Sequence, residues 1–309
     1  MLANHSQGGG RRKNVMKGPI HRNTLILGSI LCALLWSAPV WAVDSFTATY
    51  RGQGTSGTCA TTYNMNGREP SAAGLYPVFL YMVGTSESYT NASSTAAIVG
   101  MANRGYVAAS IQYRSGSFGN CSTISNKARC IFDSNRADSA ITTLCNRPKA
   151  DCTKGIVVAG FSQGSIIADL AKNYDARVQA AFGMGNGVTY IIYNLTSCVG
   201  NGNRALPSDH LRVVNGVSDS FGTGNISQLQ TLTGFNCGST AFSCLQSNGS
   251  GWYRVRGNQV QDGTADHCYM RASGGCSGSQ NSNDAGWANG ADVWELNANL
   301  DWLSGFTQH

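Results

Sequence analysis

The sequence predicts an α/β protein with a mainly parallel central sheet that is flanked by helices and carries no large cap domain. The first observation is a series of short apolar runs that are continuous rather than alternating, as is typical of parallel strands buried on both faces. The second is that stretches with apolar residues at helical spacing separate these runs. A hydrophobic content of 42% is enough to bury a core, so a collagen-like or disordered chain is disfavoured.

The strands are expected in two groups. Two segments, 46–51 and 59–64, come first and are predicted to pair as an antiparallel edge. The later apolar runs are predicted as the strands of the parallel sheet, at 76–84, 106–113, 155–160, 178–183, 211–216 and 252–255.

The helices are expected between and after these strands. Segment 95–103 follows the first long strand, and 127–145 precedes the strand at 155–160. The next helix carries an apolar stripe made of Ile166, Ile167, Leu170, Ala171 and Tyr174. The last uses Val293, Leu296, Leu300 and Leu303. Since strands and helices alternate, the sheet should be mainly parallel.

The N-terminal segment has the pattern of a secretory signal peptide. Five basic residues lie between Arg11 and Arg22, an apolar run follows at 25–36, and the small residue Ala42 ends the segment. A membrane anchor is the alternative, but this run is shorter than the ~20 residues that a spanning helix needs. We therefore expect residues 1–42 to be a cleaved signal, residues 43–309 to form one domain, and the mature protein to be secreted or periplasmic without a stable membrane span.

Removal of this signal changes the charge. The whole chain has a formal net charge of +6 from 22 basic and 16 acidic residues. All acidic residues follow position 42, so the mature chain keeps 17 basic against 16 acidic residues and is close to neutral, at +1. Nucleic-acid binding requires clustered positive charge, and we therefore expect no nucleic-acid partner.

The cysteines predict disulfides. The chain has 11, and Cys32 leaves with the signal, so ten remain, enough for five bridges in an oxidising compartment. Proximity in sequence suggests the pairs 121–130, 145–152, 237–244 and 268–276. A zinc site is the alternative, but neither a CxxC pair nor an HExxH pattern occurs, so we expect no metal.

A candidate nucleophile lies at Gly160-Phe161-Ser162-Gln163-Gly164, which matches the pattern G-x-S-x-G. In a chain with 38 glycines, about half of one such match is expected by chance, so the pattern alone is weak. Its context is stronger, because an apolar strand enters the motif and an amphipathic helix leaves it, which is the setting that the motif requires. Ser162 is therefore predicted to be the nucleophile.

A serine hydroxyl needs a base, and only three histidines follow the signal. His309 is the terminal residue and is expected to fray. His210 lies just before a strand, whereas active sites of parallel sheets lie at the carboxyl edge. His267 follows the last strand in a loop at that edge, and it is predicted to be the base by elimination.

A serine nucleophile and a histidine base act together with a third residue, an acid that orients the imidazole. Asp219 follows the strand at 211–216 by three residues and so lies at the carboxyl edge. Its rivals are Asp209, before that strand, and Asp262 and Asp266, in the histidine loop.

The order Ser162, Asp219, His267, each after its own strand, resembles the α/β-hydrolase fold, and the resemblance covers nearly all of 70–309. The entry Tyr76-Pro77-Val78 to the first long strand also resembles this family. The resemblance implies a secreted serine hydrolase of the esterase or lipase type that needs no cofactor. It also implies an oxyanion hole made by the backbone N–H groups of Gln163 and Thr85, although Val83-Gly84 stands where many relatives have His-Gly.

The Gly-x-Ser-Gln-Gly form is similar to cutinases. Cutinases, however, keep the acid and the histidine close in sequence, whereas Asp219 and His267 are 48 residues apart here. The chain is therefore not assigned to the cutinases.

The substrate is less well defined by the sequence. The segment 184–210, where large caps of this family usually lie, is short, which favours an open site for a bulky or polymeric ester. Tyr190 and Tyr193 are candidate walls of an acyl or aromatic pocket, and a purely structural packing role for them is the alternative. We expect a monomer that cleaves carboxylic esters. Amide hydrolysis, acyl transfer and a non-catalytic exported binding protein on the same scaffold are the alternative functions.

Overall fold

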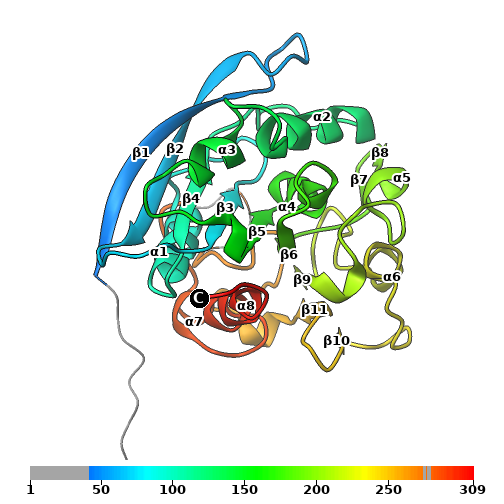
Figure 1. Ribbon diagram of the computed structural model, residues 1–309. Helices are drawn as coiled ribbons and strands as arrows, with labels where there is room; N and C mark the ends of the chain where they lie inside the picture. Colours follow the sequence, from blue (N-terminus) through cyan, green and yellow to red (C-terminus); the bar gives the residue numbers. More distant parts are fainter. Residues whose placement is uncertain (1–41, 274–275, 277–279) are drawn as a thin grey trace, which may run out of the picture. The chain divides into compact units, whose positions relative to one another are not determined.

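A nine-stranded sheet forms the centre of the protein in this computed structural model, which describes residues 42–273, 276 and 280–309 (Figure 1). Its strand order is β1-β2-β4-β3-β5-β6-β9-β11-β10. The six strands from β4 to β11 in this order run parallel, while β1, β2 and β10 add antiparallel edges. The predicted α/β class with a mainly parallel sheet is therefore confirmed.

The strands of the sheet are β1 (Val43–Gly52), β2 (Thr61–Pro70), β3 (Val78–Met82), β4 (Val107–Ile111), β5 (Ile156–Phe161), β6 (Val178–Met184), β9 (Leu211–Gly216), β10 (Ser243–Leu245) and β11 (Gly251–Val255). Almost every side chain of β3, β4, β5 and β9 is buried, because helices cover both faces.

The helices are α1 (Ala92–Ala102), α2 (Cys121–Phe132), α3 (Ala140–Cys145), α4 (Gln163–Asp169), α5 (Thr196–Val199), α6 (Ile226–Thr233), α7 (Ala285–Asn289) and α8 (Leu296–Ser304). Helices α1 and α8 pack together against one face, and α2, α3 and α4 lie against the other (Figure 1). Between β6 and β9 lie a small hairpin, β7 (Thr189–Tyr190) and β8 (Tyr193–Asn194), the short α5 and one turn of 3-10 helix at Ser208–His210.

The single helix predicted at 127–145 is wrong. Two helices, α2 and α3, occupy this stretch, and α2 begins six residues earlier, at Cys121. The side chain of Asn120 caps α2 by accepting a hydrogen bond from the N–H of Thr123 at 3.1 Å. The extended backbone of Asp133 ends it. The start and the end of α2 are thus set by single polar residues, which a search for apolar residues at helical spacing does not detect.

Five disulfides connect the ten cysteines of 43–309, as the cysteine count predicts. The predicted pairs 145–152, 237–244 and 268–276 are confirmed. The pair 121–130 is wrong, since the bridges are Cys121–Cys198 and Cys59–Cys130. Both cysteines lie on α2, where nine residues correspond to a rise of about 13.5 Å and to opposite faces, too far apart for one disulfide.

The predicted signal peptide falls on residues that the structure does not describe. Within 42–273, 276 and 280–309, no helix is both long and apolar enough to cross a membrane.

Candidate active site

Ser162 lies on a sharp turn between the central strand β5 and helix α4. Its backbone has φ 52° and ψ −120°, a positive φ that is costly for a residue with a Cβ atom. The turn is held because the N–H of Ser162 donates a hydrogen bond to the carbonyl of Met184 on neighbouring β6, at 2.8 Å. The hydroxyl therefore stands at the carboxyl edge of the sheet, as the sequence predicts for an elbow.

The two glycines of the motif allow this turn to be so tight. A Cβ atom at Gly164 would lie 2.1 Å from the carbonyl oxygen of Met82, on β3. One at Gly160 would lie 2.3 Å from the backbone of Gly164. Both distances are impossible contacts with backbone atoms, so the helix can pack against the sheet only where the motif has glycine.

His267 and Asp219 form a buried pair. Nδ1 of His267 lies 2.6 Å from Oδ2 of Asp219, and the two side chains are 4% and 0% exposed. A carboxylate only accepts hydrogen bonds, so Nδ1 carries a proton, and in the neutral imidazole Nε2 presents a lone pair. That Nε2 is buried and has no hydrogen-bond partner among the described residues. It is available for a proton from another group.

Asp219 is fixed by further donors. The N–H of Phe221 donates to Oδ1 at 2.8 Å, and the hydroxyl of Thr223 donates to Oδ2. The turn that carries these donors is itself anchored at the end of β9, because the side-chain amide of Asn215 donates to the carbonyl of Thr223 at 2.7 Å. The carboxylate thus has one orientation, and it faces His267.

The rival acids do not contact the imidazole. Asp209 lies at the start of β9, and its side chain is 65% exposed. Asp262 and Asp266 each accept a hydrogen bond from a backbone N–H two residues further along the chain. Of the four carboxylates considered from the sequence, only Asp219 bonds to His267.

The other two histidines are far from the carboxyl edge. His210 lies at the start of β9, where its Nδ1 contacts the carbonyl of Gln179 at 2.5 Å. His309, expected to fray, instead packs edge-on against Tyr106, just before β4, with ring centroids 5.1 Å apart.

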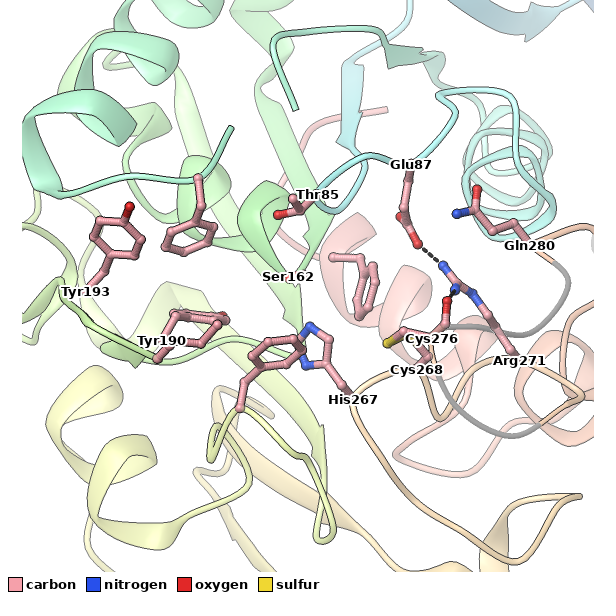
Figure 2. Close-up of a pocket in the computed structure, with 14 residues that line it drawn as sticks. Thr85, Glu87, Ser162, Tyr190, Tyr193, His267, Cys268, Arg271, Cys276 and Gln280 are labelled. Carbon is pink, nitrogen blue, oxygen red and sulfur yellow. Dashed lines mark hydrogen bonds and ion pairs between the residues drawn. A yellow bond between two sulfur atoms is a disulfide. The ribbon is translucent and has the colours of Figure 1, made fainter. Parts of the chain in front are cut away.

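Ser162 and His267 line one cavity of about 220 Å³ (Figure 2). One side of it is aromatic, where the ring of Phe118 contacts those of both Tyr190 and Tyr193. The opposite side carries the buried ion pair between Glu87 and Arg271, together with Gln280 and the disulfide Cys268–Cys276 (Figure 2). The serine and the histidine lie between an apolar wall and a polar one.

The two predicted tyrosines occupy neighbouring positions in the hairpin. Tyr190 pairs with Tyr193 across β7 and β8, and the Tyr190 hydroxyl donates to the carbonyl of Gly185 at 2.5 Å. Burial raises the pKa of Tyr190 well above its ordinary value, and the charge of Asp219 acts in the same direction. The ring therefore remains neutral and contributes apolar surface to the cavity.

Gln163 and Thr85 lie next to each other beside the serine. The side-chain amide of Gln163 donates to Oγ1 of Thr85 at 3.0 Å. In the part of the chain that the structure describes, the backbone N–H of Thr85 donates no hydrogen bond, and that of Gln163 has no acceptor within α4 because the helix begins there. Two unpaired backbone donors next to Ser162 are what an oxyanion hole requires.

Sequence reasoning did not single out the Glu87–Arg271 pair, Phe118 or Phe221. Phe221 stacks edge-on against His267 with ring centroids 4.6 Å apart, and Phe161 approaches the same imidazole at 4.9 Å. Of these residues, only Phe221 could have been noticed in the sequence, because it follows Asp219 by two residues. The other residues come from loops whose meeting depends on the fold.

No group of three or more histidine, cysteine or acidic side chains within the described residues could hold a metal ion.

Comparison with known proteins gives little further guidance. No family model and no curated protein matches the chain. Among solved structures, it is similar to the hypothetical protein PA2218 from Pseudomonas aeruginosa, with 15% identity and a TM-score of 0.37. The match covers 53% of this chain and 48% of that one, so the chain spans about half the length of this structure.

Proposed function

We propose that the protein is an exported serine hydrolase of the α/β-hydrolase type that cleaves carboxylic esters. The observation that carries the proposal is the buried pair His267–Asp219: its Nε2 has no hydrogen-bond partner among the described residues, and His267 lines the same cavity as Ser162 on its strained turn. The three residues follow β5, β9 and β11, at the carboxyl edge of one sheet. Five disulfides agree with export to an oxidising compartment.

In the proposed reaction, the hydroxyl oxygen of Ser162 attacks the ester carbonyl carbon while Nε2 of His267 takes the hydroxyl proton. Asp219 stabilises the imidazolium that forms. The carbonyl oxygen becomes an oxyanion, which accepts hydrogen bonds from the N–H groups of Gln163 and Thr85. As the tetrahedral intermediate collapses, the imidazolium gives its proton to the leaving alcohol, and an acyl-enzyme remains.

Water then completes the cycle by the same route. His267 takes a proton from water, and the oxygen attacks the acyl carbon. A second oxyanion forms, and collapse returns the proton to Ser162 and releases the acid. Every catalytic group in these reaction steps is a side chain or backbone N–H of the protein, so the proposed reaction needs neither metal nor organic cofactor.

The test is hydrolysis of short- and medium-chain p-nitrophenyl esters by the purified protein, together with labelling by a fluorophosphonate. We expect saturable release of nitrophenol and one covalent adduct, which peptide mass spectrometry should map to Ser162. Heat-denatured protein, which keeps every serine but loses the geometry, should not be labelled. Absence of both hydrolysis and labelling would instead favour a non-catalytic binding protein.

The residues at the mouth of the cavity favour a bulky ester as the substrate. Ile191 and Ile192 form the tip of the β7–β8 hairpin and are 78% and 80% exposed. Ile191 also has φ 51°, a genuine outlier for a β-branched residue, and such strain is concentrated at functional sites. Because Ile191 lines the cavity as well, the exposed apolar surface continues the aromatic wall outward.

We expect replacement of both Ile191 and Ile192 by serine to lower kcat/KM for long or polymeric apolar esters by about 30-fold, since each side chain buries surface worth ~1 kcal/mol against a long substrate. Hydrolysis of p-nitrophenyl acetate, which is too short to reach the tip, should stay within twofold. Leu75→Ser is the matched control, an apolar residue that is 53% exposed and lies before β3 at the opposite edge of the sheet. An equal loss on both substrates, or a rate jump at an oil–water interface, would contradict an open docking site.

A further inference from the structure

Lys127 is a buried cation without a carboxylate partner. Its side chain comes from the middle of α2 and is 1% exposed, and it takes part in none of the ion pairs that the described residues form. Lysine is almost never fully buried unless it is paired, because the ammonium group loses its hydration. Such a residue is costly to the fold, and a purely structural helix would gain from an apolar side chain at this position.

The ammonium group bonds to the back of the candidate oxyanion hole. Nζ of Lys127 donates to Oε1 of Gln163 at 2.8 Å and also to the carbonyl of Ser117. A lysine ammonium group can only donate, so it fixes the oxygen of the Gln163 amide on its own side. The amide nitrogen must then face the other way.

The side-chain amide nitrogen of Gln163 holds the loop that carries Thr85, the second candidate donor of the oxyanion hole. It donates to Oγ1 of Thr85 at 3.0 Å and to the carbonyl of Ser115 at 3.3 Å. The carbonyl of Ser115 also accepts from the N–H of Ser86 at 3.3 Å. Ser86 has φ 59°, so this loop adopts a strained conformation that its surroundings have to maintain.

The position of Lys127 is itself fixed by covalent bonds. Helix α2 is tied through Cys121 to Cys198 and through Cys130 to Cys59, on either side of the lysine. Burial lowers the pKa of Lys127 to about 7, and the neighbouring cation Arg114 acts in the same direction. The charged form of this lysine is therefore less stable than that of an ordinary lysine, and its side chain is held rigidly against one amide.

We propose that Lys127 is a positioning residue of this hydrolase, which acts through the side chain of Gln163 to hold the N–H groups of Gln163 and Thr85 where the oxyanion forms. The assignment rests on the proposed function. The lysine does not touch substrate. It selects one of the two orientations of the Gln163 amide, and that orientation connects α4 to the loop of Thr85.

The experiment compares wild type with Lys127→Met, Gln163→Leu and the double variant. Methionine keeps the length of the side chain and removes the donor. We expect kcat of Lys127→Met to fall about 10- to 100-fold, part of the 10²- to 10³-fold that a whole oxyanion donor contributes, while KM changes less than threefold. Affinity for a phenylboronic acid, whose tetrahedral adduct places an oxygen in the hole, should fall with kcat. Lys127→Arg, which retains a cationic donor, should recover part of the rate.

Two comparisons separate positioning from general stability. If Lys127 acts through Gln163, the double variant should be no slower than the slower single variant. Arg212→Met is the matched control, because Arg212 is also a buried cation that bonds to a backbone carbonyl and has no carboxylate partner among the described residues. It lies near the start of β9, where it donates to the carbonyl of Ala298 on α8. This replacement should leave kcat unchanged.

Multiplicative losses in the double variant, an equal loss of kcat in Arg212→Met, or a rise in KM alone would overturn the assignment of Lys127. A wild-type protein with neither esterase activity nor boronic-acid binding would overturn the proposed function along with it. If Lys127→Met does not fold, Gln163→Leu still tests the role, since it removes the same connection to Thr85 without burying or releasing a charge.

Discussion

Replacement of Ser162 by alanine should lower kcat for p-nitrophenyl esters by about 10⁴- to 10⁶-fold, while the fold and KM change little. The reason is that the attacking oxygen disappears, whereas the donors of Gln163 and Thr85 and the cavity remain. The residual rate would come from binding and from these donors. The measurement is steady-state hydrolysis, with circular dichroism to show that the variant is folded.

His267→Ala should have nearly the same effect, and the double variant should be no slower, since two residues that act as a unit do not contribute independently. Ser94→Ala is the matched control, a serine of α1 that is fully buried and bonds to backbone carbonyls away from the cavity. Activity in Ser162→Ala within tenfold of wild type would contradict the mechanism, because some other group would then be the nucleophile.

Much of the fold could be predicted because the strands of a parallel sheet are apolar throughout. Each of the six continuous runs, from 76–84 to 252–255, overlaps a strand of the parallel sheet. What failed was the interpretation of segments governed by single polar residues. Asn120 starts α2 where no apolar stripe begins, so Cys121 and Cys130 lie on one helix, and proximity in sequence was a wrong guide to their pairing.

The candidate site was predictable for a different reason. Ser162, Asp219 and His267 each follow a strand, and the carboxyl ends of parallel strands meet at one edge. The scarcity of histidine then left one suitable base. Lys127 could also have been noticed, because it lies on the same face of its helix as Ile124, Ala128 and Ile131, where an apolar residue would be expected. The ion pair Glu87–Arg271 could not, since its partners come from distant loops.

Asp219→Asn should lower kcat by about 10⁴-fold although it changes the shape of the side chain very little. In the native protein the carboxylate accepts from Thr223, from the N–H of Phe221 and from Nδ1 of His267. An asparagine has only one oxygen. If that oxygen replaces Oδ1 and accepts from the N–H of Phe221, the NH₂ group replaces Oδ2 and faces the Thr223 hydroxyl and His267, and Nδ1 must then become the acceptor.

The proton of the neutral imidazole would then reside on Nε2, which could no longer take a proton from Ser162. The rate should therefore fall through the tautomer of His267 rather than through lost packing. Asp209→Asn and Asp262→Asn are the controls, since both carboxylates were rivals in the sequence and neither contacts the imidazole. Nitrogen-15 NMR of the histidine ring should show the exchange of tautomer. A fully active Asp219→Asn enzyme would mean that the imidazole is oriented by other contacts, such as the ring of Phe221.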